Sequence, residues 1–364
     1  MRAATDLKVR FLDFYKRNEV LVSSLVFAGG FLFDLLTLGR IDDLFNLIQQ
    51  GLYLVILGTL LFMEIKILLG EFIPMGKTRR FWDFHDLIVH FLFGSLLSVY
   101  TIFYFTSASA LTSFFFILLL VGLMFANEFP QFQRIGLTVR VILYNICLLS
   151  YFAFFYPILM GHVGPLPFWL GFLTSLAGVI LIWKLNFKNA SEVFTKRVLI
   201  PALVVHGLFL GGYYLSLIPP VPVAVKQIGV YYDVEKVEGA YLGKHLRPWY
   251  KFWQKGSQDF SQRPDDRIVV LLSIFSPANF KDRIFLKWFI DNPKLGWTQE
   301  DSIPMTILGG RDEGFRGFGR KQNFRPGNWR VLVETTDGRE VGRISFTVEA
   351  DSSTDVREFK SDVF

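Results

Sequence analysis

Long apolar segments in the first 218 residues limit the possible folds more than any other feature of the chain. A helix that crosses the roughly 30 Å hydrocarbon core of a membrane needs about 20 mainly apolar residues. The sequence therefore predicts a bundle of about seven transmembrane helices over residues 20–218, preceded by a cytoplasmic segment over residues 1–19. The segments that meet the requirement are 20–38, 46–65, 87–106, 109–126, 138–159, 166–185 and 198–218.

Composition divides the chain into two parts. Charged residues make up 19% of the chain, against about 25% in ordinary soluble domains. The shortfall is confined to residues 20–218, whereas the residues from 219 onward have the composition of a soluble domain. The only cysteine, Cys147, lies inside an apolar segment, which excludes a disulfide within this sequence and a cysteine-based metal or redox motif.

Lysine and arginine residues set the orientation of the predicted bundle. Fifteen of them lie in the N-terminal segment and in, or at the span ends next to, the second, fourth and sixth connections, whereas the first, third and fifth connections contain only Arg40. Short connections rich in lysine and arginine stay in the cytoplasm. With seven spans, the N-terminus is cytoplasmic and the domain after residue 218 lies outside. The same placement accounts for the net charge of +6 without nucleic acid as a partner.

Polar residues gather near the outer end of the first predicted span. Asp34 lies about one helical turn inside that end, and Arg40, Asp42 and Asp43 follow it. Because an ionisable residue in a span is costly to bury, one interpretation is an ion or ligand site at the outer mouth. The other is that Asp34 pairs with Arg40 or with His162 of the fifth connection and fixes the helix end. We favour the second interpretation, since one ion pair near an interface is a simple structural device.

The predicted spans lack the patterns of known intramembrane chemistry. His85 and His90 are five residues apart, so on a helix they point about 140° away from each other and do not converge on a metal ion. The last span has no lysine for a retinal Schiff base, and the sequence has no GxSxG motif for a serine nucleophile. We therefore expect no metal, no cofactor and no catalytic residue, and the sequence favours a non-enzymatic role.

Residues 219–226 form a proline-rich tether, after which the pattern is typical of β-structure. Candidate strands are rich in valine, isoleucine and aromatic residues and are bounded by turn residues. Asp337-Gly338 supplies the positive φ angles that a tight hairpin needs. The sequence predicts an antiparallel, immunoglobulin-like sandwich over residues 227–350 and a polar tail over residues 351–364. The candidate strands are 227–234, 267–276, 283–290, 303–308, 329–336 and 340–348.

An aromatic segment, LRPWYKFWQKGSQDF, interrupts the strands at residues 246–260. Tryptophan and lysine side chains of this kind favour lipid headgroups. The segment is equally consistent with a short helix that caps the sandwich. The sequence leaves both alternatives open.

The glycine-rich stretch GGRDEGFRGFGRK covers residues 309–321. A phosphate-binding loop lies between a parallel strand and a helix, but this stretch lies between predicted antiparallel strands, so we interpret it as a turn and an irregular edge strand. Its cations either project together toward anionic headgroups, a glycan or an acidic partner, or pair with Asp312, Glu313 and neighbouring carboxylates. The candidate binding residues are Arg311, Arg316, Arg320, Lys321 and Arg325.

Several of these segments resemble one family. They are IPPVPVAVKQIGVYYDV, PWYKFW, IFSPANF, GFLFDLLTLGRID and, most specifically, residues Gly309–Val348 with the strands GNWRVLV and RISFTV. Together they resemble bacterial membrane proteins that carry domain of unknown function 2914. This chain has Gly319 where many relatives have a serine or an aromatic residue. The resemblance implies a bacterial envelope protein with an outer β-domain, and it implies no reaction.

The combined expectation is a non-enzymatic protein of the bacterial inner membrane. Its N-terminus is cytoplasmic, and its C-terminal β-sandwich is periplasmic or extracellular and binds an envelope protein, a glycan or a lipid headgroup. The alternative function is a transporter or an intramembrane enzyme that uses Asp34, with the outer domain as its regulator.

Overall fold

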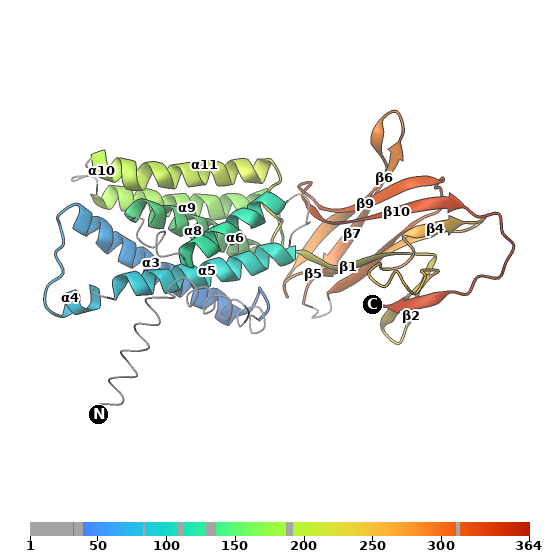
Figure 1. Cartoon of the computed structure of the whole chain (residues 1–364), viewed down its shortest axis with the longest axis horizontal. Helices are drawn as coiled ribbons and strands as arrows, with labels where there is room; N and C mark the ends of the chain where they lie inside the picture. The colour runs from blue at the N-terminus through green and yellow to red at the C-terminus, as the bar shows by residue number, and fades with distance from the viewer. Residues whose placement is uncertain are drawn as a thin grey trace, which may run out of the picture. The chain divides into compact units, whose positions relative to one another are not determined.

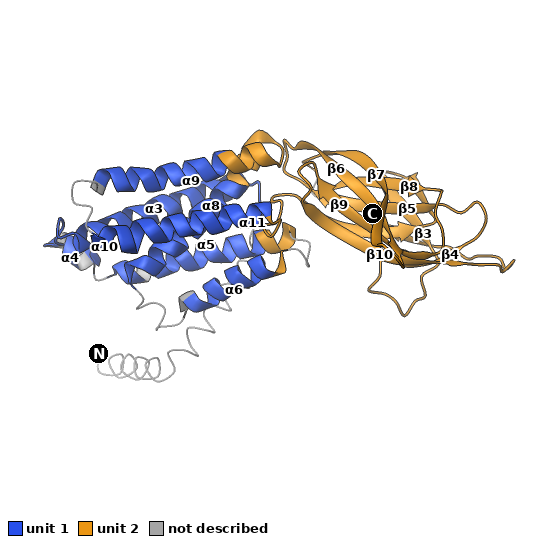
Figure 2. Ribbon diagram, turned by 90° about the horizontal axis from the view of Figure 1, so that it is seen from above, with its two compact units in different colours: residues 1–103, 115–153, 170–214 blue, residues 104–114, 154–169, 215–364 orange. Residues whose placement is uncertain are grey.

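The computed structural model describes residues 32, 39–82, 84–107, 113–128, 136–186, 192–310 and 314–364. The chain divides into two compact units, one helical and one mostly β (Figures 1 and 2). The helical unit, blue in Figure 2, comprises residues 1–103, 115–153 and 170–214. The β-domain unit, orange in Figure 2, comprises residues 104–114, 154–169 and 215–364.

The N-terminal region is built from long apolar helices. The described helices are α3 (Leu44–Leu68), α4 (Lys77–Trp82), α5 (His85–Ser107), α6 (Phe114–Glu128), α8 (Leu137–Met160), α9 (Pro165–Asn186), α10 (Glu192–Phe194) and α11 (Ile200–Tyr214), with a π-helical turn, η2 (Thr195–Leu199). Many of their apolar side chains point outward, including Phe115 and Leu208. Helices that are apolar all round suit a hydrocarbon environment.

Five of the described helices are long and apolar enough to cross a membrane. The helix over Leu44–Leu68 includes the predicted span 46–65. The predicted span 109–126 corresponds to a shorter apolar helix, Phe114–Ala126. The predicted span 20–38 lies outside the described residues except for Leu32. The count of seven spans therefore stays a prediction.

The C-terminal region is a β-rich domain with three sheets. The first has the order β1-β5-β8, the second β4-β10-β9-β6-β7 and the third β11-β3-β2. The strands are β1 (Ala224–Tyr231), β2 (Asp233–Val237), β3 (Ala240–His245), β4 (Asp259–Gln262), β5 (Ile268–Phe275), β6 (Lys281–Asn292), β7 (Gly296–Leu308), β8 (Phe315–Lys321), β9 (Gly327–Thr335), β10 (Glu340–Ala350) and β11 (Lys360–Val363).

Strand β5 is buried on both of its faces, which explains its continuous apolar run. Val270 and Leu272 belong to the main core, which also contains Trp288 and Trp329 of the five-stranded sheet. Side chains from the opposite face of β5 pack in a second core with Tyr231, Val234 and Phe364. The domain is therefore layered, with the sheet β1-β5-β8 between the five-stranded sheet and the small sheet β11-β3-β2.

The predicted hairpin between β9 and β10 is confirmed. Gly338 has a φ of 80°, and the Gly338 amide donates to the Thr335 carbonyl oxygen at 3.0 Å. The register pairs Phe346 with Trp329 and Ile344 with Val331. The side chains of these four residues are buried, so the alternation in the sequence identifies the core-facing positions of both strands.

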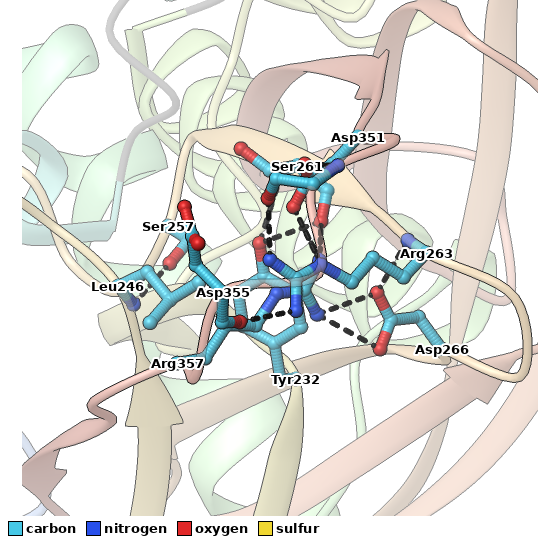
Figure 3. A network of polar contacts seen from close by, with 10 residues as sticks. Tyr232, Leu246, Ser257, Ser261, Arg263, Asp266, Asp351, Asp355 and Arg357 are labelled. Carbon is cyan, nitrogen blue, oxygen red and sulfur yellow. Dashed lines mark hydrogen bonds and ion pairs between the residues drawn. The ribbon is translucent and has the colours of Figure 1, made fainter.

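The segment predicted as a polar tail, residues 351–364, is part of the domain. Strand β11 pairs with β3 in register, with Lys360 opposite His245. Between β10 and β11, the Arg357 guanidinium donates to both carboxylate oxygens of Asp266, at 3.1 and 2.8 Å, and lies 5.1 Å from the centroid of the Tyr232 ring (Figure 3). Arg263 Nε donates to Asp351 Oδ2 at 2.7 Å. A segment without an apolar pattern is thus fixed by ion pairs to residues about 90 positions earlier.

The connection between α8 and α9 packs against the β-domain within the same compact unit. The Lys281 amide at the start of β6 donates to the Gly161 carbonyl oxygen at 2.9 Å. The Val163 amide donates to Asp282 Oδ2 at 2.9 Å, and the Val163 side chain belongs to the main β core. The β core is therefore completed by residues from outside the predicted domain boundary.

Candidate functional site

The predicted cationic residues do not all project together. Strand β8 is an edge strand, as predicted, and because side chains alternate along a strand, Arg316 and Arg320 lie on one face and Lys321 on the other. Lys321 is only 8% exposed, forms an ion pair with Asp301 and lies 5.4 Å from the Trp329 ring centroid. Lys321 is therefore a structural residue: its side chain packs next to the core, and its charge is balanced by Asp301.

The other cations of this stretch differ in their surroundings. Arg316 Nη1 donates to the Gly239 carbonyl oxygen at 3.5 Å, and the Arg320 guanidinium lies 4.7 Å from the Phe318 ring centroid. Arg325 pairs with Glu300 at 3.0 Å. Arg311 lies outside the described residues, as do Asp312 and Glu313. Only Arg316 and Arg320 share a described face.

The residues predicted at the outer mouth of the bundle make local structural contacts. Arg40 forms a two-point ion pair with Asp42, with both N–O distances at 3.0 Å. Asp43 is the N-cap of α3, and its carboxylate accepts from the Phe45 amide at 3.0 Å. His162 Nδ1 lies 3.4 Å from the Val163 carbonyl oxygen. Asp34 is outside the described residues, so the transporter or enzyme alternative stays a prediction.

Residues 247–256, which we call the aromatic loop, form an exposed apolar surface of the β-domain. Trp249 is 83% exposed and Phe252 is 77% exposed, and the side chains of Tyr250 and Trp253 are also largely exposed. The loop consists of turns and irregular backbone and contains no helix, so of the two alternatives left open by the sequence, the capping helix is wrong. Large exposed aromatic clusters mark interaction surfaces. The sequence identified the segment and left its exposure open.

The Asp362 carboxylate of β11 holds both ends of the aromatic loop. At the first end, the Arg247 guanidinium donates to both Asp362 oxygens, at 3.0 and 3.1 Å. At the second end, the Gly256 amide donates to Asp362 Oδ2 at 3.0 Å. Arg247 also donates to the Gln254 carbonyl oxygen across the loop. Such two-point, charge-assisted contacts are strong and directional, so the loop has a fixed base.

The backbone near the second end of the loop requires glycine. Gly256 has a φ of 71°, and a Cβ atom there would lie 1.9 Å from the Val230 carbonyl oxygen. The Ser257 amide donates to that same oxygen at 2.7 Å. This close approach attaches the loop to β1, and Ser257 Oγ in turn accepts from the Leu246 amide at 2.8 Å.

Two titratable groups beneath the loop have shifted pKa values. Burial alone would raise the pKa of Asp362, but hydrogen bonds from Arg247 and Gly256 outweigh it and lower the pKa below its usual range. Burial, helped by the positive charge of Arg247, lowers the pKa of His245 although Asp362 opposes the shift. His245 Nδ1 accepts from the Arg247 amide at 3.1 Å, so in the neutral ring Nε2 carries the proton and faces Asp362 Oδ1 at 3.3 Å.

The charge of the aromatic loop is one-sided. Arg247, Lys251 and Lys255 are positive, and residues 246–258 contain no acidic residue. Lys251 pairs with Asp259 just after the loop. The rings of Trp249 and Tyr250 stand at 86° to each other, and those of Phe252 and Trp253 at 80°. The surface is therefore a protruding aromatic cluster with a cationic border.

The helical unit contains an ionic cluster that the sequence analysis missed. Arg140 of α8 donates to Glu64 of α3 at 3.0 Å and to Asp86 of α5. His85 is buried, stacks on Trp82 with a centroid distance of 4.2 Å and places Nε2 4.0 Å from Glu64 Oε2. The available signal was that opposite charges lie near the ends of three predicted spans, at the side predicted to be cytoplasmic.

Among the residues that the structure describes, no group of three or more His, Cys, Asp or Glu side chains is arranged to hold a metal ion. Glu64 Oε2, His85 Nε2 and Arg140 Nε are buried without a hydrogen-bond partner. The cluster connects α3, α5 and α8 through ion pairs, although some of its buried polar atoms make no hydrogen bond.

Comparison with known proteins identifies one segment of the β-domain. Residues 281–348, from the start of β6 to near the end of β10, match the model of DUF2914, a protein family of unknown function. The expected resemblance to the DUF2914 family is confirmed for this segment. The DUF2914 segment contains Arg316, Arg320 and Lys321, whereas the aromatic loop precedes it. A comparison with curated proteins finds no match.

Three solved structures show weak similarity to the chain. They are an immunoglobulin-like protein from Pseudomonas aeruginosa (11% identity, 35% of this chain and 98% of that chain, TM-score 0.22), a β-glucosidase from Listeria innocua in complex with gluconolactone (11% identity, 32% and 16%, TM-score 0.18), and an alkylpurine DNA glycosylase from Pseudomonas fluorescens bound to DNA containing an abasic site analog (10% identity, 86% and 99%, TM-score 0.20). TM-scores this low carry no argument about this chain.

Proposed function

We propose that this DUF2914 chain is a non-enzymatic, membrane-anchored protein whose β-domain binds a protein partner in the bacterial envelope through the aromatic loop. One observation carries the proposal. Four neighbouring aromatic side chains are exposed to solvent on a loop that Asp362 holds at both ends.

The fixed base of the loop explains why exposed aromatic side chains suit binding. Trp and Tyr contribute a large share of the binding energy at protein interfaces. Ordering a mobile loop on binding would cost free energy for each immobilised side chain. The contacts of Arg247 and Gly256 with Asp362 order the backbone before the partner arrives, so less of the binding energy is lost to ordering.

The chemistry of the loop favours a protein with an apolar pocket and an acidic border. The rings of Trp249 and Tyr250, and those of Phe252 and Trp253, stand nearly perpendicular to each other, so neither pair forms a shared flat platform. Of the three cations of the loop, Arg247 pairs with Asp362 and Lys251 with Asp259. The exposed Lys255 is the cation that complements a carboxylate at the border of the partner's pocket. Lipid headgroups, the other class with suitable charge, are distinguished by the experiment below.

A photocrosslinking amino acid at Phe252 in the full chain tests the proposal in intact cells. We expect a discrete crosslinked protein from this position and none from Leu295, a matched control that is 76% exposed in the β6–β7 turn. Trp249→Ala together with Trp253→Ala should lower the yield at Phe252 by about tenfold or more, as expected for central aromatic contacts. Crosslinks to lipid alone, or an unchanged yield in the double variant, would overturn the proposal.

The anchor and its orientation form the second part of the proposal. Five apolar helices support membrane insertion, seven spans would place the β-domain outside, and the sheets of the domain would form an immunoglobulin-like sandwich. Leu295→Cys in a Cys147→Ser background gives one exposed thiol on the β-domain. We expect a membrane-impermeant maleimide to label it in spheroplasts; labelling only after lysis would place the domain in the cytoplasm.

The exposed arginines of β8 are a second candidate surface on the same domain. Because Lys321 is buried against Asp301 and Trp329, a variant that includes Lys321→Ala would disturb the fold. Arg316→Ala with Arg320→Ala is the informative pair, since neither side chain is buried. An unchanged crosslink from Phe252 in this pair would restrict the contact surface to the aromatic loop.

A further inference from the structure

The imidazole ring of His85 lies between two carboxylates in the ionic cluster of the helical unit. Its Nδ1 atom lies 3.4 Å from Asp86 Oδ1, and its Nε2 atom lies 4.0 Å from Glu64 Oε2. The second distance is too long for a hydrogen bond. Nε2 and Glu64 Oε2 are both buried without a hydrogen-bond partner, so they face each other across a gap that no hydrogen bond closes.

A neutral imidazole cannot donate to both of these carboxylates. The neutral ring carries one proton, and an ionised carboxylate only accepts hydrogen bonds. With the ring proton on Nδ1, the nitrogen closer to a carboxylate, Nε2 and Glu64 Oε2 direct lone pairs toward each other. A second proton, placed on Nε2, would provide a donor for each carboxylate. The arrangement around His85 therefore fits an imidazolium ion.

The charge of the cluster is also unbalanced without that second proton. Glu64 and Asp86 each carry a negative charge, and Arg140 pairs with both of them through a single positive charge. Among the described residues, these three are the charged groups that act on His85. One proton on the His85 ring makes the sum of the charges zero, as buried charged groups require.

The indole ring of Trp82 adds a further contact that favours a positive charge on His85. The two rings are stacked, with a centroid distance of 4.2 Å and an angle of 17° between their planes. A cation over the face of a tryptophan within about 6 Å of the ring centroid is attracted by it. One face of the His85 ring and both of its nitrogens are therefore next to groups that stabilise a cation.

We propose that His85 binds one proton on acidification, and that this proton forms an Nε2–H···Oε2 hydrogen bond that links α5 directly to α3. Without it, the hydrogen bonds of the cluster connect α3 to α5 through Arg140 of α8. Solvent reaches the cluster at Asp86, whose side chain is 73% exposed, so a proton can enter although the two facing atoms are buried. This link does not depend on the partner proposed for the aromatic loop.

Two opposing effects determine the pH range in which the link forms. His85 precedes the candidate span that begins at Ile88. Burial of the ring lowers the pKa of His85, and the negative charge of Glu64 opposes this shift without reversing it. The proton therefore binds below the usual histidine value of about 6.5. At pH 7.5 the ring is neutral, which agrees with the open distance of 4.0 Å.

Nuclear magnetic resonance of the full chain in phosphatidylcholine nanodiscs tests the proposal. Histidine and glutamate are isotope-labelled, the chain has five histidines, and His85→Gln identifies the signals of His85 by their loss. At pH 7.5 we expect a single ring proton, on Nδ1. At pH 4.5 we expect a proton on each ring nitrogen and a contact between the Nε2 proton and the side-chain carboxyl carbon of Glu64.

Glu64→Gln tests the carboxylate that faces Nε2, because the amide keeps the size of the side chain and removes its charge. We expect this variant to lower the proton affinity of His85 about tenfold or more, since an opposite charge at this distance favours the charged form. The control is Glu192→Gln, which removes a carboxylate from an exposed ion pair with Lys196 and should leave the proton affinity unchanged. Thermal unfolding checks that both variants are folded.

Three results would overturn the proposal. A proton on Nε2 at pH 7.5 would show that the link forms without acidification. An Nε2 atom that stays unprotonated at pH 4.5 would show that it does not form at all. An unchanged proton affinity of His85 in folded Glu64→Gln would remove the role of the carboxylate. If Glu64→Gln does not fold, the protonation of Nε2 in the unaltered chain at the two pH values decides alone.

Discussion

In each of the two units, one charged side chain connects several neighbouring groups: Arg140 in the helical unit and Asp362 in the β-domain. The two clusters differ in how completely their polar atoms are hydrogen-bonded. In the helical unit, Arg140 binds Glu64 and Asp86, while three polar atoms of the cluster stay without hydrogen bonds. In the β-domain, Asp362 accepts from Tyr231, Arg247 and Gly256. An ion that makes all its bonds fixes one geometry, whereas a cluster with unused atoms has other arrangements of similar energy.

The largest expected effect comes from removing the β-domain charge. Asp362→Ala leaves the half-buried Arg247 guanidinium unpaired, so we expect a loss of about 3 kcal/mol of the free energy of unfolding and rapid proteolysis of the aromatic loop. Chemical denaturation and limited proteolysis of the full chain measure the two effects. The control is Asp259→Ala, which removes an exposed ion pair with Lys251 and should change stability by less than about 1 kcal/mol. Equal losses in the two variants would contradict the role of Asp362.

A smaller effect is expected in the helical unit. Arg140→Met leaves Glu64 and Asp86 without their shared cation, and we expect a loss of roughly 2 kcal/mol. Adding Glu64→Gln removes one of the two negative charges and should restore part of the loss, because the unused atoms allow the cluster to rearrange. Thermal unfolding in nanodiscs measures both variants. A double variant less stable than Arg140→Met would show that this cluster is as rigid as the one around Asp362.

The smallest effect concerns pH. Because burial lowers the pKa of His245 in the folded domain, the unfolded chain binds a proton first as the pH falls below the usual histidine value of about 6.5. The contribution of His245 to stability is therefore present above that pH and is lost on acidification. We expect the unfolding temperature of the β-domain to fall between pH 7.5 and pH 5.5. His245→Gln should reduce this drop in unfolding temperature. If the variant has the same pH profile as the unaltered chain, the drop arises from other titratable groups.

The sequence predicts those parts of the fold that depend on local patterns. The helix over Leu44–Leu68 follows from its apolar length, and the β9–β10 hairpin follows from Asp337-Gly338 and the alternation around it. The sequence also predicts β8 as an edge strand. It did not predict that Arg320 and Lys321 point to opposite faces, although this follows from the alternation of side chains along a strand.

The candidate site was less predictable because its contacts are distant in the sequence. Arg247 and Asp362 are 115 residues apart, and Arg140 and Glu64 are 76 apart. Neither β11 nor the segment before it has an apolar pattern that would mark a strand. Only the tertiary structure shows that Asp362 organises the aromatic loop, whose own composition had already marked it as unusual.

The distance between Arg247 and Asp362 also has a consequence for synthesis of the chain. At translation rates of about 5–20 residues per second, the ribosome adds Asp362 roughly 6–23 s after Arg247. During that interval the nascent polypeptide carries two tryptophans, a tyrosine and a phenylalanine on an untied segment. Chaperones that recognise exposed aromatic sequences therefore have several seconds in which to bind, and they must release the segment before strand β11 can dock.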